Sequence, residues 1–180
     1  AYSVSNVSNA ALFAAMPYVN AAGTLTFTPA PSAFGTSTFD VRVQDNGGTP
    51  NGGEDTSAIS TFAITVNSVN DEPSFIATSP APVNEDAGAQ SIPGWVTAFN
   101  PGNPYEAAQS VLAYSVSNVS NAALFATMPY VNAAGTLTFT PAPSAFGTST
   151  FDVTVQDTGG TPNGGEDTSA PQAFVITVNP

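Results

Sequence analysis

A long internal repeat constrains this chain more than any other feature of its sequence. Residues 1–68 recur at residues 113–180 with a constant offset of 112 residues, and eight of the 68 aligned positions differ. This similarity indicates a duplicated module, in which each copy adopts the same structure. Residues 76–112 have no counterpart before the first residue. We therefore expect an incomplete first module over residues 1–73, without its leading strands, and a complete second module over residues 74–180.

The incomplete first copy has two explanations, and the sequence leaves both open. In the first explanation the chain is a piece of a longer array of modules. In the second, another chain supplies the missing strands, as in donor-strand complementation. The two explanations make different functional predictions, because strand exchange between chains would build a filament or a surface layer.

Hydrophobic and polar residues alternate along much of the chain, which is typical of half-buried β-strands. Phe151, Val153 and Val155 share one face of an expected strand over residues 148–155. Further strands are expected at residues 91–98, 109–118, 123–127, 129–132 and 136–140 and at the end of the chain. Gly- and Pro-rich turns separate these segments. The pattern predicts an all-β fold of tandem immunoglobulin-like sandwiches with Greek-key connections.

The charge balance excludes several classes of partner. The chain has 13 acidic residues, no His and a single basic residue, Arg42, which gives a net charge of −12. We expect no nucleic-acid partner, because affinity for phosphates depends on clustered Lys and Arg. No run of about 18 apolar residues is present, so we expect no membrane insertion. Without His, Cys or Lys the chain offers almost no nucleophile or general base, and we expect no enzyme activity.

The most recognisable segment spans residues 43–75 and reads VQDNGGTPNGGEDTSAISTFAITVNSVNDEPSF; it is followed at residues 84–95 by NEDAGAQSIPGW. These segments resemble the last two strands, the linker and the beginning of the next module in cadherin-like repeats. The chain as a whole is most similar to the bacterial cadherin-like and immunoglobulin-like tandem repeats of large cell-surface adhesins. This resemblance implies an extracellular location, contacts with neighbouring repeats of the same chain, and calcium at the junctions between modules.

The acidic residues themselves also predict calcium. The loop over residues 157–168 precedes the last strand, so it lies at the end of the module that receives the linker over residues 69–73. We therefore expect Asp71, Glu85 and Asp157, together with Asp167, to converge there. Carboxylates that lie close together repel one another unless a cation compensates for their charge.

Calcium fits this chemistry because it accepts about six to eight oxygen ligands, including Asn side chains, in a flexible geometry. Magnesium needs stricter octahedral geometry, and zinc prefers His and Cys, which are absent. About one or two calcium ions at each junction are expected. The candidate ligands are Asn70, Asp71, Glu85, Glu106, Asp157 and Asp167.

Three functions are compatible with the sequence. The modules can be calcium-rigidified spacers in a long adhesin, or subunits of a surface filament or layer in which identical chains exchange strands. They can also be carbohydrate- or protein-binding modules that use exposed aromatic residues such as Tyr18, Tyr105 and Tyr130. The similarity of the two copies favours the first two functions, because a spacer needs repetition and little individuality.

Overall fold

The computed structural model describes all 180 residues and divides the chain into unit 1, Ala1–Ser68, and unit 2, Val69–Pro180. The division falls at Ser68 and not at the predicted residue 73, because Asn70 and Pro73 are buried within unit 2. The helices are all short 3-10 turns, and none has the length or hydrophobicity needed to cross a membrane.

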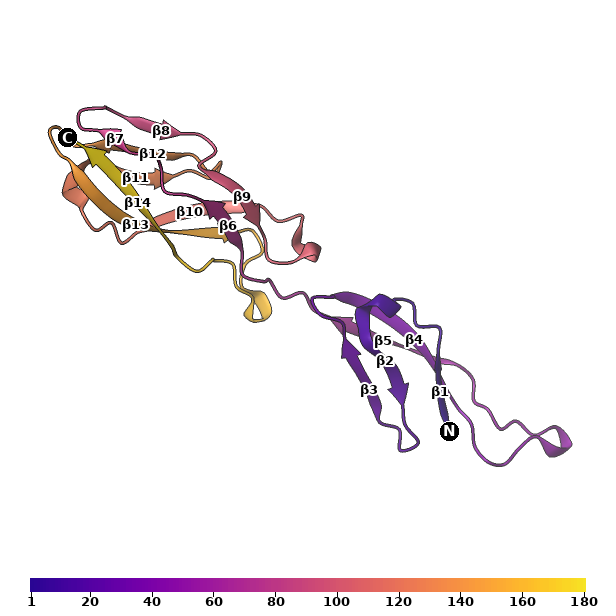
Figure 1. The fold of residues 1–180 in the computed structure, drawn as a ribbon. Coiled ribbons are helices and arrows are strands. Elements are labelled where there is room, and N and C mark those ends of the chain that lie inside the picture. The colour runs from indigo at the N-terminus through magenta and orange to yellow at the C-terminus, as the bar shows by residue number, and fades with distance from the viewer. The chain divides into compact units, whose positions relative to one another are not determined.

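Unit 1 contains five strands, which Figure 1 draws in indigo to purple. They are β1 (Tyr2–Ser5), β2 (Phe13–Val19), β3 (Leu25–Pro29), β4 (Gly35–Val43) and β5 (Ser60–Val66). Strands β1, β4 and β5 form one antiparallel sheet, and β2 and β3 form a separate hairpin. The 3-10 turns η1 (Ala10–Leu12) and η2 (Pro50–Gly52) complete the unit. Its small core contains Leu12, Phe13, Phe39 and Ile64.

Unit 2 repeats these five strands and places four more before them. The repeated strands are β10 (Val111–Ser117), β11 (Phe125–Val131), β12 (Leu137–Pro141), β13 (Gly147–Asp157) and β14 (Gln172–Asn179). The preceding strands are β6 (Ser74–Ala77), β7 (Val83–Asn84), β8 (Gln90–Ile92) and β9 (Val96–Asn100). The connecting 3-10 turns are η3 (Pro104–Glu106), η4 (Ala122–Leu124) and η5 (Pro162–Gly164).

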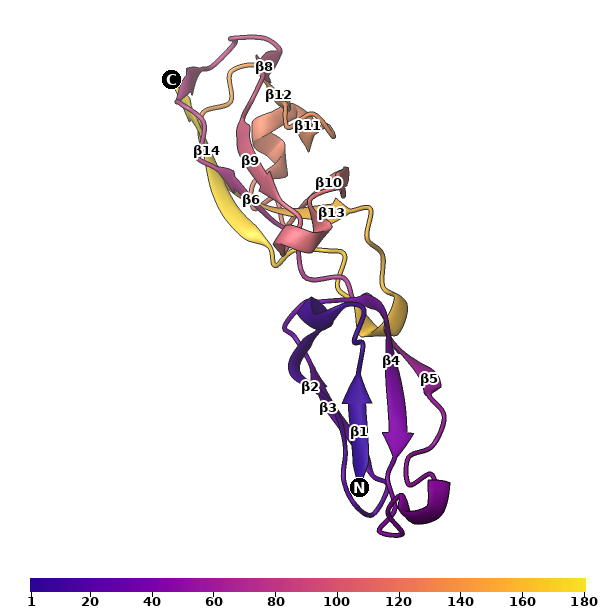
Figure 2. The ribbon, with the colours of Figure 1, turned by 90° about the vertical axis from the view of Figure 1, so that its right-hand side faces the viewer.

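The strands of unit 2 form a sandwich. One sheet has the order β10-β13-β14-β7 and the other β11-β12-β8, while β6 pairs with β9. In Figure 2, β14 and the β11–β12 pair lie on different sides of this unit. Strands that are neighbours in a sheet, such as β10 and β13, are not consecutive in the chain. The chain between them crosses to the other sheet, where it forms β11 and β12. The predicted all-β, immunoglobulin-like sandwich is confirmed.

The core of unit 2 lies between these sheets. Phe151, Val153 and Val155 are completely buried, as the alternation predicted, because they lie on the face of β13 that joins one core cluster with Leu137 and Phe139 of β12 in the other sheet. Trp95 enters the same core from the segment before the repeat, and its ring meets that of Phe174 edge to face at 4.8 Å. Residues 69–112 therefore complete the hydrophobic core of unit 2.

Two strand predictions are wrong in detail. The expected strand over residues 91–98 is two strands, β8 and β9, because Gly94 adopts a left-handed backbone (φ 66°) directly after Pro93. The two strands expected on either side of Met128 are the single strand β11. Register shifts in its pairing with β12 accommodate Pro129, which lacks an N–H group, without ending the strand.

Candidate functional site

The linker enters unit 2 beside the loop that connects β13 to β14. Asn70 is 7% exposed, and its side-chain amide donates to both carboxylate oxygens of Asp157, at 3.1 and 3.4 Å. The same side-chain amide donates to the backbone carbonyl of Glu166 at 2.8 Å. The backbone carbonyl of Asn70 in turn accepts the Glu166 N–H at 2.9 Å. Asp157 also accepts the Gly159 N–H at 2.9 Å. These bonds fix the linker against the loop.

Two glycines make room for Asn70 in this loop. A Cβ atom at Gly159 would lie 1.9 Å from Asn70 Oδ1, and one at Gly165 would lie 2.8 Å from the Asn70 backbone nitrogen. Any larger residue at these positions would displace the linker. The glycines of the loop therefore form the space that holds Asn70.

A second group of polar residues surrounds Asp71. Glu106 is 4% exposed; its Oε1 accepts the Asp71 N–H at 3.0 Å, and its Oε2 accepts the Asn103 N–H at 3.3 Å. The Asn103 side chain caps η3 by accepting the Tyr105 N–H at 2.8 Å, and its amide donates to Asp71 Oδ2. Since Asn70 and Asp71 are adjacent in the chain, the linker joins this group to the first.

The electrostatics of this region are unusual. Asp157 and Glu106 are buried carboxylates, and every hydrogen bond that they accept comes from a neutral group. Unit 2 contains no Lys, Arg or His. In addition, Gln109 Nε2 donates to Asn70 Oδ1 at 2.7 Å, while the buried Gln109 Oε1 has no hydrogen-bond partner. A buried charge without a counter-charge is costly, so this arrangement favours a cation.

The structure brings four of the predicted site residues to the linker end of unit 2: Asn70, Asp71, Glu106 and Asp157. The expected convergence of Glu85 on this end is wrong. The Glu85 N–H donates to the carbonyl of Asn179 at 2.7 Å, because β7 runs parallel to the end of β14. Glu85 thus lies at the opposite end of the unit, where the final strand finishes.

Asp167 lies in the loop but turns toward β13, where its carboxylate accepts from Gln156 Nε2 at 2.9 Å and from the Thr168 hydroxyl at 2.8 Å. No three of the chain's carboxylates converge as a ready-made metal cluster. Sequence reasoning also missed Gln109, because nothing in the sequence distinguishes this residue from any other Gln that precedes a strand. The sequence Asn-Pro-x-Glu before it is a capping-box signature and predicts the η3 geometry.

The carboxyl group of Asp167 leads to a prediction about pH. Hydrogen bonds from Gln156 and then Thr168 lower the pKa of Asp167 below the ordinary value of an aspartate. A lowered pKa stabilises the fold above pH of about 4, and this contribution is lost as the pH falls through the pKa of the folded state. We expect Gln156→Ala to raise the pKa of Asp167 in an NMR titration.

The repeat supplies a matched control for this titration. Asp55 in unit 1 has a pKa lowered by the equivalent hydrogen bonds from Gln44 and Thr56. Gln44→Ala should therefore raise the pKa of Asp55 and leave that of Asp167 unchanged. A pKa of Asp167 that does not respond to Gln156→Ala would contradict the assigned cause.

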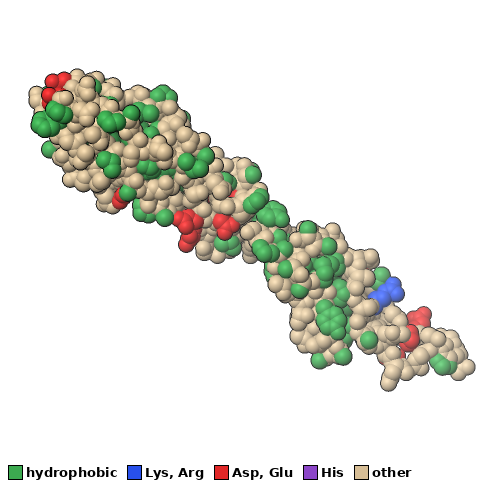
Figure 3. Space-filling view, in the orientation of Figure 1, with side chains coloured by type: hydrophobic (Ala, Val, Ile, Leu, Met, Phe, Trp, Pro, Cys, Tyr) green, Lys and Arg blue, Asp and Glu red, His purple; other side chains and the backbone are tan.

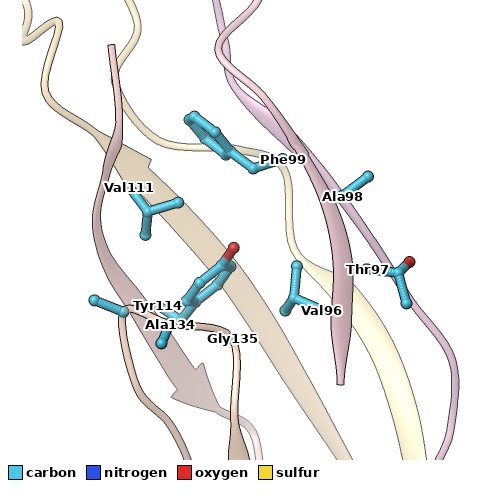
Figure 4. Close-up of a pocket in the computed structure, with 9 residues that line it drawn as sticks. Val96, Thr97, Ala98, Phe99, Val111, Tyr114, Ala134 and Gly135 are labelled. Atoms are coloured by element: carbon cyan, nitrogen blue, oxygen red, sulfur yellow. The ribbon is translucent and has the colours of Figure 1, made fainter. Parts of the chain in front are cut away.

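A small hollow elsewhere in unit 2 is a poor candidate for a ligand site. It has a volume of about 220 Å³, and Val96, Phe99, Val111 and Tyr114 lie around it, as Figure 4 shows. Desolvation raises the pKa of the Tyr114 hydroxyl. Ligand pockets usually have volumes of about 300–1,000 Å³, so this hollow is smaller than typical sites.

The surface of unit 2 agrees with a site at its linker end. Most of the acidic side chains visible on this unit in Figure 3 lie toward its two ends, with largely uncharged surface between them. The exposed aromatic residues Tyr105 and Tyr130 are each 59% exposed, and Tyr18 in unit 1 is 60% exposed. Tyr18 and Tyr130 occupy equivalent positions of the repeat, so their exposure is a property of the module.

Comparisons with known proteins show the fold. No protein-family model and no curated protein sequence matches the chain. Among solved structures, the chain is similar to human protocadherin-24 EC1-2 (form II), with a TM-score of 0.57 and 19% identity over 99% of this chain and 81% of that chain. A mouse protocadherin-24 EC1-3 structure has a TM-score of 0.53 and 20% identity, over 99% of this chain and 58% of that chain. Both similarities identify cadherin-like sandwiches.

Proposed function

We propose that the chain is a non-enzymatic, cadherin-like structural segment of an extracellular cell-surface protein, and that calcium fixes the linker at the end of unit 2. The observation that supports this proposal is the pair of buried carboxylates, Asp157 and Glu106, in a unit without Lys, Arg or His. The chain would act as a spacer of the kind found in long bacterial adhesins, with neighbouring repeats of the same chain as its partners.

The residues at the linker end suit calcium. Asp157, Asp71 and Glu106 offer carboxylate oxygens. The side chains of Asn70 and Asn103 lie beside Asp157 and Asp71 with their amide nitrogens toward them, and would turn over to offer an oxygen to an ion. The buried oxygen of Gln109, which has no hydrogen-bond partner, adds a further neutral acceptor beside Asn70. Calcium accepts such mixed oxygen ligands in flexible geometry, whereas zinc would need His or Cys. Asp167 remains a candidate that would have to turn away from Gln156, and Glu85 lies too far along the unit to contribute here.

The protein's own residues prepare this site before any ion binds. The loop glycines hold Asn70 against Asp157, and η3 holds Glu106 against the backbone of Asp71. The linker is therefore already positioned by hydrogen bonds. A bound calcium ion would neutralise the buried carboxylates and so would strengthen the attachment of the linker to unit 2. Such a rigid attachment is what a spacer requires.

Thermal unfolding tests this proposal. An ion that binds the folded state at about 100 times its dissociation constant stabilises that state by about 2.7 kcal/mol. For a unit of this size, we expect the melting temperature to rise by roughly 10 °C when calcium replaces EDTA. Trp95 is the single Trp of the chain and lies in the core of unit 2, so its fluorescence reports on this unit.

A variant and a second metal sharpen the test. Asp157→Asn should abolish the rise with calcium, although it removes a buried charge and need not destabilise the calcium-free protein. Magnesium at the same concentration should produce a smaller rise. Equal melting temperatures of the wild type in calcium and in EDTA would refute the calcium proposal.

A further inference from the structure

Gln109 joins the two groups of polar residues at the linker end of unit 2. Its Nε2 donates to Asn70 Oδ1 at 2.7 Å, and its backbone N–H donates to the backbone carbonyl of Glu106 at 2.8 Å. The next residue, Ser110, is paired with Thr158: its N–H donates to the Thr158 hydroxyl, and its carbonyl accepts the Thr158 N–H. The backbone around Gln109 is therefore fixed, and any rearrangement at this position belongs to its side chain.

The side-chain amide of Asn70 is oriented by acceptors at one end and by Gln109 at the other. Its nitrogen faces three oxygens: the two carboxylate oxygens of Asp157, at 3.1 and 3.4 Å, and the backbone carbonyl oxygen of Glu166, at 2.8 Å. Its oxygen faces the donor Nε2 of Gln109. Donors meet acceptors at both ends, so hydrogen bonding favours this orientation when no cation is bound.

The same orientation of Asn70 is unfavourable once a cation is bound. The amide hydrogens of Asn70 carry partial positive charge and lie against the oxygens that Asp157 would offer to a cation. To offer an oxygen itself, Asn70 has to invert its amide, which turns Oδ1 toward Asp157 and Nδ2 toward Gln109. Without a cation the inverted amide sets its oxygen against carboxylate oxygens, which repel it. The preferred orientation of the Asn70 amide therefore differs between the two states.

Inversion of Asn70 requires a second inversion, at Gln109. An inverted Asn70 presents the donor Nδ2 to the donor Nε2 of Gln109, and two donors form no hydrogen bond. Gln109 must then present its acceptor, Oε1, in place of Nε2. This oxygen is buried and has no hydrogen-bond partner, so Gln109 breaks no bond of Oε1 when it inverts. One hydrogen bond between Asn70 and Gln109 is exchanged for another of opposite direction.

The packing around Asn70 accommodates the inverted amide. A Cβ atom at Gly159 would lie 1.9 Å from Asn70 Oδ1 and 2.6 Å from its Nδ2, so both ends of the amide lie beside the space that this glycine leaves. Inversion exchanges an oxygen and a nitrogen of similar size about the Cβ–Cγ bond. The backbone bond from the Glu166 N–H to the Asn70 carbonyl does not involve this side chain and is kept.

We propose that Asn70 and Gln109 invert together when calcium binds at Asp157, and that Gln109 is the positioning residue that sets the orientation of Asn70. In the calcium-free protein Gln109 donates to Asn70, and the Asn70 nitrogen faces Asp157. In the calcium-bound protein Asn70 offers Oδ1 beside Asp157, and Gln109 accepts from the Asn70 nitrogen. This inference rests on the proposed calcium site, and it gives a role there to a residue outside the predicted ligand set.

NMR of the side-chain amides in the whole 180-residue chain tests the paired inversion, with spectra in EDTA and in calcium chloride. In EDTA we expect a scalar coupling across the hydrogen bond from Asn70 Nδ2 to the carbonyl carbon of Glu166. In calcium this coupling should disappear, and one from Asn70 Nδ2 to the side-chain carbonyl carbon of Gln109 should replace it. If calcium shifts the Asp157 signals and the coupling to Glu166 persists, the inversion is wrong and the calcium site stands. If calcium shifts no signal at the linker end, both proposals fail.

Two variants of Gln109 test its role by calorimetric titration of calcium, and Trp95 fluorescence checks that unit 2 of each is folded. An ionised Glu can only accept, so Gln109→Glu favours the inverted Asn70. It should bind calcium at least about tenfold more tightly than Ser110→Glu, which adds the same charge at an exposed neighbouring position.

Gln109→Met can neither donate nor accept, so it loses the bond to Asn70 in both states. We therefore expect its calcium affinity to stay within about threefold of the wild type. A loss of about tenfold or more would show that Gln109 binds the ion directly, which would overturn the positioning role. Equal affinities of Gln109→Glu and Ser110→Glu would overturn it as well, because the added charge alone would then account for the change.

Discussion

Phe174→Ala is expected to destabilise unit 2 by about 3–5 kcal/mol, whereas the equivalent Phe62→Ala in unit 1 should cost less than about 1 kcal/mol. Phe174 is 6% exposed and its ring contacts Trp95, Phe75 and Phe151, so its loss leaves a cavity in the core. Phe62 is 52% exposed and its one ring contact is with Phe39.

Urea unfolding monitored by Trp95 fluorescence measures the loss of stability in Phe174→Ala. Hydrogen exchange of the β4 and β5 amides measures the loss of stability in Phe62→Ala. Phe62→Ala should leave the Trp95 transition where it is in the wild type, because the two phenylalanines belong to different units. Equal destabilisation by the two substitutions would show that Phe62 is buried in solution, which would contradict its exposure in unit 1.

Gly159→Ala is expected to release the linker from unit 2 and to cost about 1–3 kcal/mol through overpacking. The added Cβ would lie 1.9 Å from Asn70 Oδ1, so Asn70 would have to leave Asp157. The Glu166 N–H, which donates to the Asn70 carbonyl, should then exchange with solvent faster. Hydrogen exchange at Glu166 measures this effect directly.

Gly47→Ala is the matched control for this prediction. Gly47 is the equivalent of Gly159 in unit 1, where a Cβ atom would meet only the Asp45 side chain, at 3.2 Å from its Oδ1. We expect a change below about 0.5 kcal/mol, as for most surface substitutions. Slow exchange at Glu166 in Gly159→Ala would mean that the linker is held by contacts other than those of Asn70.

The alternation of residues predicted the strands that carry the repeat, because those strands are long and half-buried. Phe151, Val153 and Val155 lie in the core as the period of two requires. Strands β6 and β7 were not predicted, since segments of four and two residues carry no measurable period. The break between β8 and β9 depends on the backbone of Gly94, which hydrophobicity does not record.

The candidate site was predictable only in part. The position of a loop relative to the linker follows from strand order, so the linker was expected beside the loop over residues 157–168, and in the structure Asn70 of the linker contacts Asp157 of that loop. The position of Glu85 depends on the parallel pairing of β7 with β14, which is a tertiary contact that the sequence does not specify. The exposure of Phe62 shows the same limit, since its sequence context is nearly that of the buried Phe174.

Calorimetric titration of calcium into the chain tests the central proposal most directly, with Asp157→Asn and Asp45→Asn as the paired variants. Asp45 is the unit 1 equivalent of Asp157, and its side chain accepts the Gly47 N–H. We predict saturable calcium binding by the wild type and by Asp45→Asn, and its loss in Asp157→Asn. A wild type that binds no calcium, or binding that Asp157→Asn leaves unchanged, would contradict a calcium site at the linker end of unit 2.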